Sequence, residues 1–344
     1  MHVTLQDVAK LAGVSTKTVS RVVNHQGEIS ETTRLRVQEA IDQLGYRPNF
    51  LARSLVRQQT NTLAVVASGL EYYGPSRTLA GVEHQSYQFG YSLLFSLLPQ
   101  PRDSDVVSIL DSFATRRVDG IIWAVPEIGN NRDWIHQDLL DSLPPIVFIS
   151  MAPRQGLSTV AIDNRTGSGQ VAEHFIQTGK RRIGVITGPL DWWEARERLD
   201  GFTTRLQEMG ISTDPTLIAE GDWSATSGKR CMQQILEQDP DLDAVFACND
   251  SMALGAMGLA HEKGLRIPED IAFAGFDDIP EAACFWPPLT TVHQKLFTLG
   301  AISVQVLQNL IEARQQVGAD DAVENRLLDT EFFIRESSAG HLPE

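Results

Sequence analysis

The sequence predicts an N-terminal all-α domain followed by a larger α/β body that contains two parallel sheets. The first 60 residues carry three stretches with helical spacing of apolar residues. Beyond residue 61, short runs rich in Val, Ile and Ala alternate with helical stretches, which is typical of a parallel sheet covered on both faces. These runs are too many for one sheet of ordinary size, and 344 residues suggest two or three domains. We therefore expect two α/β subdomains in the body.

The N-terminal helices are expected in a helix-turn-helix arrangement. Residues 4–12 form the first helix, with Thr4 as its N-cap and Gly13 ending it. Ser15 is expected to cap a second short helix, and a third helix is expected over residues 31–44. Two short helices joined by a glycine-containing turn of three or four residues form the helix-turn-helix motif.

The second helix, within VSTKTVSRVVN, carries the side chains that are expected to contact DNA. In this motif the N-terminal end of the second helix enters the major groove. Because Val19 and Val22 face inward, the polar residues between them face outward. A small helical bundle with an ordinary polar surface is the alternative that the spacing alone leaves open. We expect base contacts from Thr16, Lys17 and Arg21, and phosphate contacts from Thr18, Ser20 and Asn24.

The stretch YRPNFLARSL predicts a short helix that forms on DNA. Asn49 is its expected cap, and residues 50–57 allow only two turns, which are marginal in water. The helix becomes stable where Leu51 and Leu55 are buried and Arg53 is paired. A DNA minor groove provides both, with Leu55 wedged between base pairs. The alternative is a plain linker.

Charge is divided unevenly along the chain. The net charge is -15, yet residues 1–60 carry +3 and the remainder carries -18. A basic domain on an acidic body binds phosphates locally. No apolar run approaches the roughly 20 residues of a membrane span, and the N-terminus lacks an apolar signal core, so we expect a cytoplasmic protein without membrane contact. The three cysteines form no CxxC pair and are expected as reduced thiols: Cys231, Cys248 and Cys284.

The body is expected to consist of alternating strands and helices. The predicted strands cover residues 63–67, 92–97, 120–125, 146–150, 160–162, 183–187, 244–247 and 271–274, and predicted helices include 166–177, 195–209, 227–238 and 251–263. Ligands of open α/β sheets bind at the carboxyl ends of the strands.

The residues at and after these strand ends predict a carbohydrate site. Aromatic rings cover the C–H face of a pyranose, while amide, guanidinium and carboxylate groups bind its hydroxyls. Each residue has an ordinary structural alternative, since a Trp is often core and a strand-end Asp is often a helix cap. The predicted effector-binding residues are Ser68, Tyr72, Trp123, Ser150, Trp192, Trp193, Arg198, Trp223, Asn249, Asp277 and Gln294.

The stretch TLQDVAKLAGVSTKTVSRVVN, followed by LGYRPNFLARSL, closely resembles the headpiece of the lactose/galactose repressor (LacI/GalR) family. The body resembles the same family through GDWSATSG, ACNDSMALGAM, GLRIPEDIAFAGFDD and PPLTTVHQ. The resemblance implies a periplasmic-binding-protein-like core of two subdomains joined by three crossovers, near residues 162–163, 288–291 and 322–325. It also implies a hinge helix that carries Leu55 into the DNA.

The resemblance implies a domain plan and a set of contacts. It assigns base contacts to Thr16, Lys17 and Arg21, and effector contacts to Arg198, Trp223, Asn249, Asp277 and Gln294. Thr4, Tyr46 and Asn49 are further expected DNA contacts. Ser150 stands where the lactose-binding member of the family has a ligand Asp, and Ala124 stands where an Asn is usual in the first subdomain. Both departures argue against a simple lactose-type ligand. The plan is a helix-turn-helix headpiece (1–47), a hinge helix and linker (48–61), a first subdomain (62–162 and 290–322) and a second subdomain (163–289 and 323–339).

The predicted function is a homodimeric transcriptional repressor that binds operator DNA and is controlled by a small carbohydrate. The expected effector is a di- or oligosaccharide, such as a β-glucoside or β-galactoside, that induces DNA release. A monosaccharide effector or a corepressor is the alternative, and a sugar-binding transport protein is the alternative of another class. No catalytic residue, metal or cofactor is expected, since the carboxylate pairs Glu194/Glu197 and Asp277/Asp278 are interpreted as a solvated helix face and a strand end. After the last predicted strand, residues 327–334, no heptad run follows, so a dimer and not a tetramer is expected.

Overall fold

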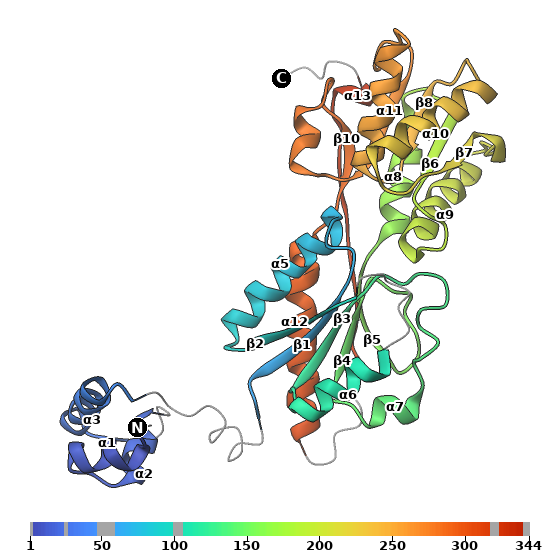
Figure 1. Cartoon of the computed structure of the whole chain (residues 1–344). Helices are drawn as coiled ribbons and strands as arrows, with labels where there is room; N and C mark the ends of the chain where they lie inside the picture. Colours follow the sequence, from blue (N-terminus) through green and yellow to red (C-terminus); the bar gives the residue numbers. More distant parts are fainter. Residues whose placement is uncertain (1–2, 24–26, 47–58, 99–105, 317–322, 340–344) are drawn as a thin grey trace. The chain divides into compact units, whose positions relative to one another are not determined.

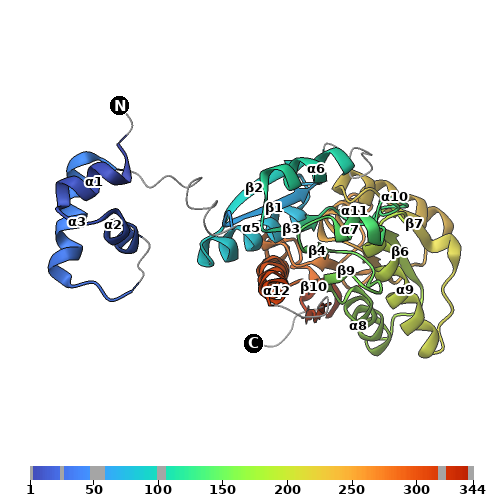
Figure 2. The same ribbon diagram turned by 90° about the horizontal axis from the view of Figure 1, so that it is seen from below.

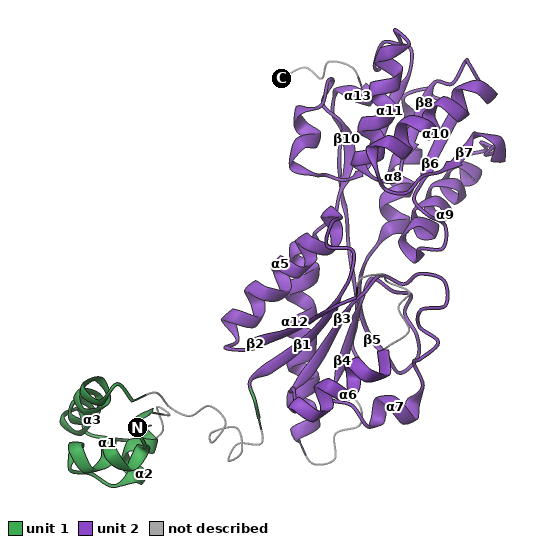
Figure 3. Ribbon diagram, in the orientation of Figure 1, with its two compact units in different colours: residues 1–60 green, residues 61–344 purple. Residues whose placement is uncertain are grey.

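The computed structural model describes residues 3–23, 27–46, 59–98, 106–316 and 323–339, and the chain divides into two compact units. The first unit comprises residues 1–60 and the second comprises residues 61–344 (Figure 3). Each unit has its own hydrophobic core among the described residues. The two units are therefore described separately.

The first unit contains the three predicted helices, α1 (Leu5–Ala12), α2 (Thr16–Val23) and α3 (Glu31–Leu44). A capping box starts α1, because the Thr4 side chain accepts from the Asp7 amide while the Asp7 carboxylate accepts from the Thr4 amide at 2.8 Å. Gly13 ends the helix in the left-handed conformation, with φ of 64°. The all-α helix-turn-helix prediction is confirmed.

The second unit holds two six-stranded sheets, each in its own subdomain (Figure 1). Every strand pair of the first sheet is parallel, in the order β11-β5-β4-β3-β1-β2. The elements of this first subdomain are β1 (Thr62–Ala67), α5 (Tyr73–Gln88), β2 (Ser92–Leu97), α6 (Val106–Arg116), β3 (Gly120–Ala124), α7 (Gln137–Asp141), β4 (Ile146–Ile149), β5 (Ser158–Ile162), α12 (Leu296–Gln315) and β11 (Asn325–Leu328).

The second sheet has the order β12-β10-β9-β8-β6-β7, and only its β10–β12 pair is antiparallel. Helices α8 and α9 lie side by side in this subdomain (Figures 1 and 2). Its elements are α8 (Asn164–Gln177), β6 (Ile183–Thr187), α9 (Trp193–Glu208), η1 (Pro215–Leu217), β7 (Ile218–Glu220), α10 (Ala225–Gln238), β8 (Ala244–Ala247), α11 (Asp250–Glu262), β9 (Ala272–Asp277), η2 (Pro280–Cys284), β10 (Thr290–His293), β12 (Glu331–Phe333) and α13 (Glu336–Ala339).

Two of the three predicted crossovers are misplaced. Strand β10 pairs with β9 of the second sheet, so the chain returns to the first subdomain after residue 293 and not near 288–291. The single strand predicted over residues 327–334 is two strands, because β11 pairs with β5 and β12 pairs with β10. The last crossover therefore falls at residues 329–330 and not at 322–325. An apolar run shows that a strand forms but does not show which sheet it joins.

Helix α12 is the central support of the first subdomain. It is long and apolar enough to cross a membrane by length and composition, but half of that window is buried. It packs against α5 and against β3, β4 and β5. Close approach to α5 requires glycine on both helices: a Cβ at Gly81 would lie 1.9 Å from the Phe297 carbonyl oxygen, and one at Gly300 would lie 2.0 Å from that of Thr78. We therefore assign α12 to the protein core.

Candidate functional site

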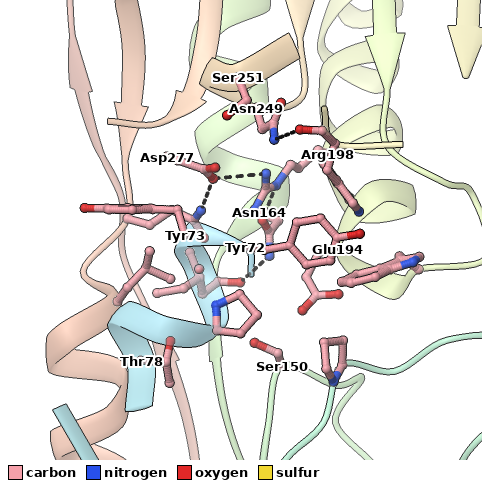
Figure 4. Close-up of a pocket in the computed structure, with 18 of the residues that line it drawn as sticks. Tyr72, Tyr73, Thr78, Ser150, Asn164, Glu194, Arg198, Asn249, Ser251 and Asp277 are labelled. Carbon is pink, nitrogen blue, oxygen red and sulfur yellow. Dashed lines mark hydrogen bonds and ion pairs between the residues drawn. The ribbon is translucent and has the colours of Figure 1, made fainter. Parts of the chain in front are cut away.

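A pocket of about 390 Å³ lies among the carboxyl ends of the strands in the second unit (Figure 4). Both subdomains contribute to it, since its lining includes the start of α5 and the loops after β3 and β4 as well as the starts of α9 and α11. The volume is within the range of small-molecule sites, which are about 300–1,000 Å³. Eight of the predicted effector-binding residues line it: Tyr72, Ser150, Trp192, Arg198, Trp223, Asn249, Asp277 and Gln294.

A buried polar network occupies the second-subdomain side of the pocket. Arg198 is 5% exposed, and its Nε donates to Asn164 Oδ1 at 2.8 Å. Its Nη1 donates to the Cys248 carbonyl at 2.5 Å and to Asp277 Oδ1 at 3.3 Å. The same Asp277 oxygen accepts from Gln294 Nε2 at 2.5 Å. Burial raises the pKa of Asp277 to about 6, although Arg198 and Gln294 oppose the shift.

Three aromatic rings form a wall beside this network. The rings of Tyr72 and Trp192 are 5.9 Å apart and those of Trp192 and Trp223 are 5.7 Å apart, both edge to face. Gly188 leaves room for Trp223, because a Cβ there would lie 2.1 Å from the indole ring. Asn249 joins the wall to α11: its Nδ2 donates to the Trp223 carbonyl at 3.0 Å and its Oδ1 accepts from the Met252 amide.

The three other predicted effector residues, Ser68, Trp123 and Trp193, lie outside the lining of the pocket. Trp123 is 1% exposed, packs 4.7 Å from Trp134 and has the Arg132 guanidinium 5.9 Å from its ring centroid. Trp123 is the fourth of the five residues of β3, and it packs in a buried cluster with Leu110 and Phe113 of α6. A position near the strand end does not show which face of the sheet the side chain covers. Ser68 is 2% exposed and Trp193 is buried beside the loop after β3.

The interpretation of Glu194 as part of a solvated helix face is wrong, because this residue lines the pocket. It is the second residue of α9, and its Oε2 is enclosed without a hydrogen-bond partner. Burial raises the pKa of Glu194 to about 7, against the opposing effects of the helix N-terminus, Arg198 and Ser150. Its spacing four residues before Arg198 on one helix face was the available signal. The pocket contains further residues that sequence reasoning missed: Glu71, Tyr73, Thr78, Asn164 and Ser251.

The loop after β3, in the first subdomain, contacts residues 191–193 of the second subdomain beside the pocket. Ile128 forms an isolated antiparallel bridge with Trp192. The Gly129 amide donates to the Asp191 carbonyl at 2.8 Å, and the Trp193 amide donates to the Glu127 carbonyl at 2.9 Å. Trp192 is therefore held at the pocket by backbone contacts from the opposite subdomain.

The carboxylates next to the pocket have structural partners. Asp278 accepts from Arg335 Nη2 at 2.7 Å and lies 3.0 Å from His293 Nδ1. Asp250 is fully buried and accepts from Thr291 Oγ1 at 2.6 Å. Burial, and after it a neighbouring carboxylate, raises the pKa of Asp250 well above its usual range. Within the described part of the chain, no cluster of His, Cys, Asp and Glu is arranged to hold a metal ion.

On the first unit, the polar face of α2 is exposed as the sequence predicts. Thr16, Lys17 and Arg21 are exposed, whereas Val19 and Val22 are buried. Thr18 and Ser20 are half-buried on this helix, and Thr4 is exposed at the start of α1. Tyr46 is 8% exposed and packs in the core of the unit, which does not favour a DNA-contacting ring. Asn24, Asn49, Arg53 and Leu55 lie outside the described residues.

A helix-turn-helix unit joined to two α/β subdomains that enclose a ligand-sized pocket defines a DNA-binding regulator controlled by a small molecule. Residues 4–49 match the bacterial regulatory proteins of the lacI family, and residues 172–338 match a periplasmic binding protein-like domain. The chain belongs to the LacI family and is a DNA-binding transcriptional repressor with a sugar or other small-molecule effector.

Individual proteins agree with this assignment. The HTH-type transcriptional repressor PurR of Haemophilus influenzae is 36% identical over 315 residues, covering 91% of this chain and 92% of that protein. The crystal structure of the lac repressor dimer bound to operator and the anti-inducer ONPF has a TM-score of 0.85 at 32% identity, covering 98% and 99% of the two chains. The complex of the transcriptional regulator CelR with cellobiose has a TM-score of 0.69 at 32% identity, covering 98% and 100%.

Proposed function

We propose that the effector of this repressor is a di- or oligosaccharide of the β-glucoside or β-galactoside class, and that its binding releases the protein from operator DNA. The observation that carries the proposal is the pairing of an aromatic wall with a polar network in one pocket. Tyr72, Trp192 and Trp223 supply apolar ring area, while Arg198 and Asp277 supply fixed hydrogen-bonding groups. The Arg198 guanidinium lies 5.6 Å from the centroid of the Trp223 ring.

The composition of the pocket suits a sugar with more than one ring. Polar groups that are buried reject a ligand lacking the matching hydroxyls, so the network selects the inner ring. The aromatic wall offers a surface for a second ring. The likeness to the CelR–cellobiose complex supports the same ligand class.

Ligand control is expected to act through the relative positions of the two subdomains. The pocket lining comes from both subdomains, so a ligand that contacts both favours the arrangement that fits it best. If that arrangement does not suit DNA binding, occupancy lowers operator affinity by linkage. Induction by the sugar follows from this preference.

A homodimer is proposed as the DNA-binding form. Large apolar side chains are exposed at one edge of the first sheet: Phe95 (43%) and Leu97 (56%) on β2, and Tyr87 (74%) near the end of α5. An exposed edge strand with such residues suits an interface with a second copy. The similarity to the lac repressor dimer supports this assembly. Two copies of the first unit then bind a pseudo-palindromic operator.

We propose a cytoplasmic, non-enzymatic role. Neither carboxylate pair considered for glycoside hydrolysis converges on one bond. Glu194 faces the pocket whereas Glu197 lies 3.5 Å from Arg165 Nη1, and Asp278 is paired with Arg335 while Asp277 lines the pocket. The same pocket would also suit a sugar-transport protein. The helix-turn-helix unit with its exposed Lys17 and Arg21 favours the regulator.

Two measurements test the proposal. Tryptophan fluorescence is followed while cellobiose, lactose, longer β-linked oligomers, glucose, galactose and a purine are titrated into the protein. Each ligand that binds is then added to a gel-shift assay with the DNA upstream of the protein's own gene. We expect a disaccharide or longer oligomer to bind and to release the DNA. A response to a monosaccharide or purine alone would contradict the proposal.

A further inference from the structure

Glu194 places a carboxylate oxygen, Oε2, in the pocket without a hydrogen-bond partner. Its Oε2 is enclosed and accepts no hydrogen bond, and Figure 4 shows its carboxylate between Tyr72 and Ser150 with no dashed line reaching it. The guanidinium of Arg198 is already engaged by Asn164 and Asp277. A ligand placed in the pocket therefore meets a carboxylate that needs a donor.

Two guanidinium groups, those of Arg198 and Arg132, lower the pKa of Glu194 through their charge, but burial outweighs them. In the loop after β3, Arg132 is buried and donates through Nη1 to Asn131 Oδ1 at 3.1 Å and through Nη2 to the Val125 carbonyl. In the same loop Glu127 pairs with Arg154, which follows β4. The start of α5 adds a further acid to the lining, Glu71.

Without Glu194, the helix N-termini that line the pocket would favour binding of an anion. Strand ends and helix starts meet here, and exposed amides at a helix N-terminus attract phosphate and carboxylate groups. At the N-terminus of α9 the negative charge is already supplied by the protein, since Glu194 is the acidic residue of the first turn. A second anion would be placed beside the first, and like charges oppose each other.

We propose that Glu194 makes the pocket select an uncharged ligand with hydrogen-bond donors and reject its phosphorylated or carboxylated counterpart. This rests on the proposed carbohydrate effector and narrows it to a neutral sugar. The hydroxyl of such a sugar donates to Glu194 Oε2 and completes its hydrogen bonding. The preference for a neutral sugar then has two sources: the hydrogen bond from its hydroxyl to Glu194, and the repulsion between Glu194 and an anionic ligand.

The test compares a neutral sugar with its phosphate in matched variants. Calorimetry of the full chain at pH 8 measures binding of cellobiose and cellobiose 6-phosphate, and of lactose and lactose 6-phosphate. We expect the wild type to prefer the neutral sugar by more than about tenfold, and Glu194→Gln to shrink that preference by about tenfold or more. Glu197→Gln, on the same helix, should keep the wild-type preference. Glu194→Asp retains the charge and should continue to reject the phosphate.

A second measurement does not depend on sugar binding. Thermal unfolding is followed at pH 8 with and without inorganic phosphate. We expect phosphate to stabilise Glu194→Gln, whose α9 N-terminus no longer carries a carboxylate, and not the wild type or Glu197→Gln. Equal phosphate effects on all three proteins, or an unchanged sugar preference in Glu194→Gln, would overturn the inference. Failure of every carbohydrate to bind the wild type would instead overturn the proposed effector class.

Discussion

Arg198 and Asp277 form an ion pair that is withdrawn from solvent, with Nη1 3.3 Å from Oδ1 and exposures of 5% and 9%. Removing one partner of such a pair leaves the other charge uncompensated, which costs about 3–5 kcal/mol. Asp277→Ala should therefore lower the free energy of unfolding by about that amount and abolish ligand binding. Urea denaturation measures the first effect.

The matched control for this change is the surface pair of Lys229 and Glu262, whose side chains are 48% and 58% exposed. Exposed pairs contribute about 0–1 kcal/mol, so Glu262→Ala should have little effect on the free energy of unfolding. Equal losses from Asp277→Ala and Glu262→Ala would show that the buried pair is not structurally important.

Two tryptophans that look alike in the sequence should respond differently to truncation. Trp123 is 1% exposed in the first-subdomain core, so Trp123→Ala should cost about 3–5 kcal/mol of stability. Trp192 is half-buried in the pocket wall, so Trp192→Ala should cost less stability and weaken saccharide binding by about tenfold or more. Denaturation and calorimetry on both variants separate the roles. Normal saccharide affinity in Trp192→Ala would remove it from the site.

The amino-acid sequence predicts where strands and helices lie along the chain better than which of them are neighbours in space. Parallel strands buried on both faces appear as continuous apolar runs, and the strand Ile183–Thr187 was predicted with its observed bounds. The pairing of β11 with β5 depends on residues about 166 positions apart, and no local pattern encodes it. In the same way, Trp192 and Trp193 are adjacent in sequence, yet only Trp192 lines the pocket, because α9 docks against the loop after β3.

The raised pKa of Glu194 predicts a pH dependence of stability. Its pKa is about 7 in the folded protein against an ordinary 4.5, so folding favours the protonated form. The stabilising contribution of Glu194 is present below pH 4.5 and is lost as pH rises through 7. The free energy of unfolding of Glu194→Gln should therefore decline less between these pH values than that of the wild type. Parallel profiles from urea denaturation would contradict a raised pKa at this position.

Arg21 on the exposed face of α2 is expected to read a base edge. Its guanidinium can donate two hydrogen bonds to a guanine, so Arg21→Ala should cost about 1–3 kcal/mol per half-site on the preferred operator. The affinity for scrambled DNA should change much less. Arg36→Ala, also exposed but on α3, is the control and should leave the ratio of specific to non-specific binding unchanged. Fluorescence anisotropy at fixed salt measures both affinities, and an unchanged ratio in Arg21→Ala would exclude base recognition by Arg21.

The exposed edge of the first sheet predicts where two copies meet. Leu97 on β2 is 56% exposed at one edge of the sheet, and Leu327 on β11 is 60% exposed at the other. A charge buried in an interface is costly, so Leu97→Asp should shift the protein from dimer to monomer at micromolar concentration. Leu327→Asp adds the same charge at a similar exposure and should leave the dimer intact. Sedimentation velocity gives the masses, 38.0 kDa for the monomer and twice that for the dimer.

Because each half-site binds weakly alone, Leu97→Asp should also lose operator affinity while its pocket still binds the sugar. Dissociation by Leu327→Asp and not by Leu97→Asp would move the interface to the opposite edge of the sheet.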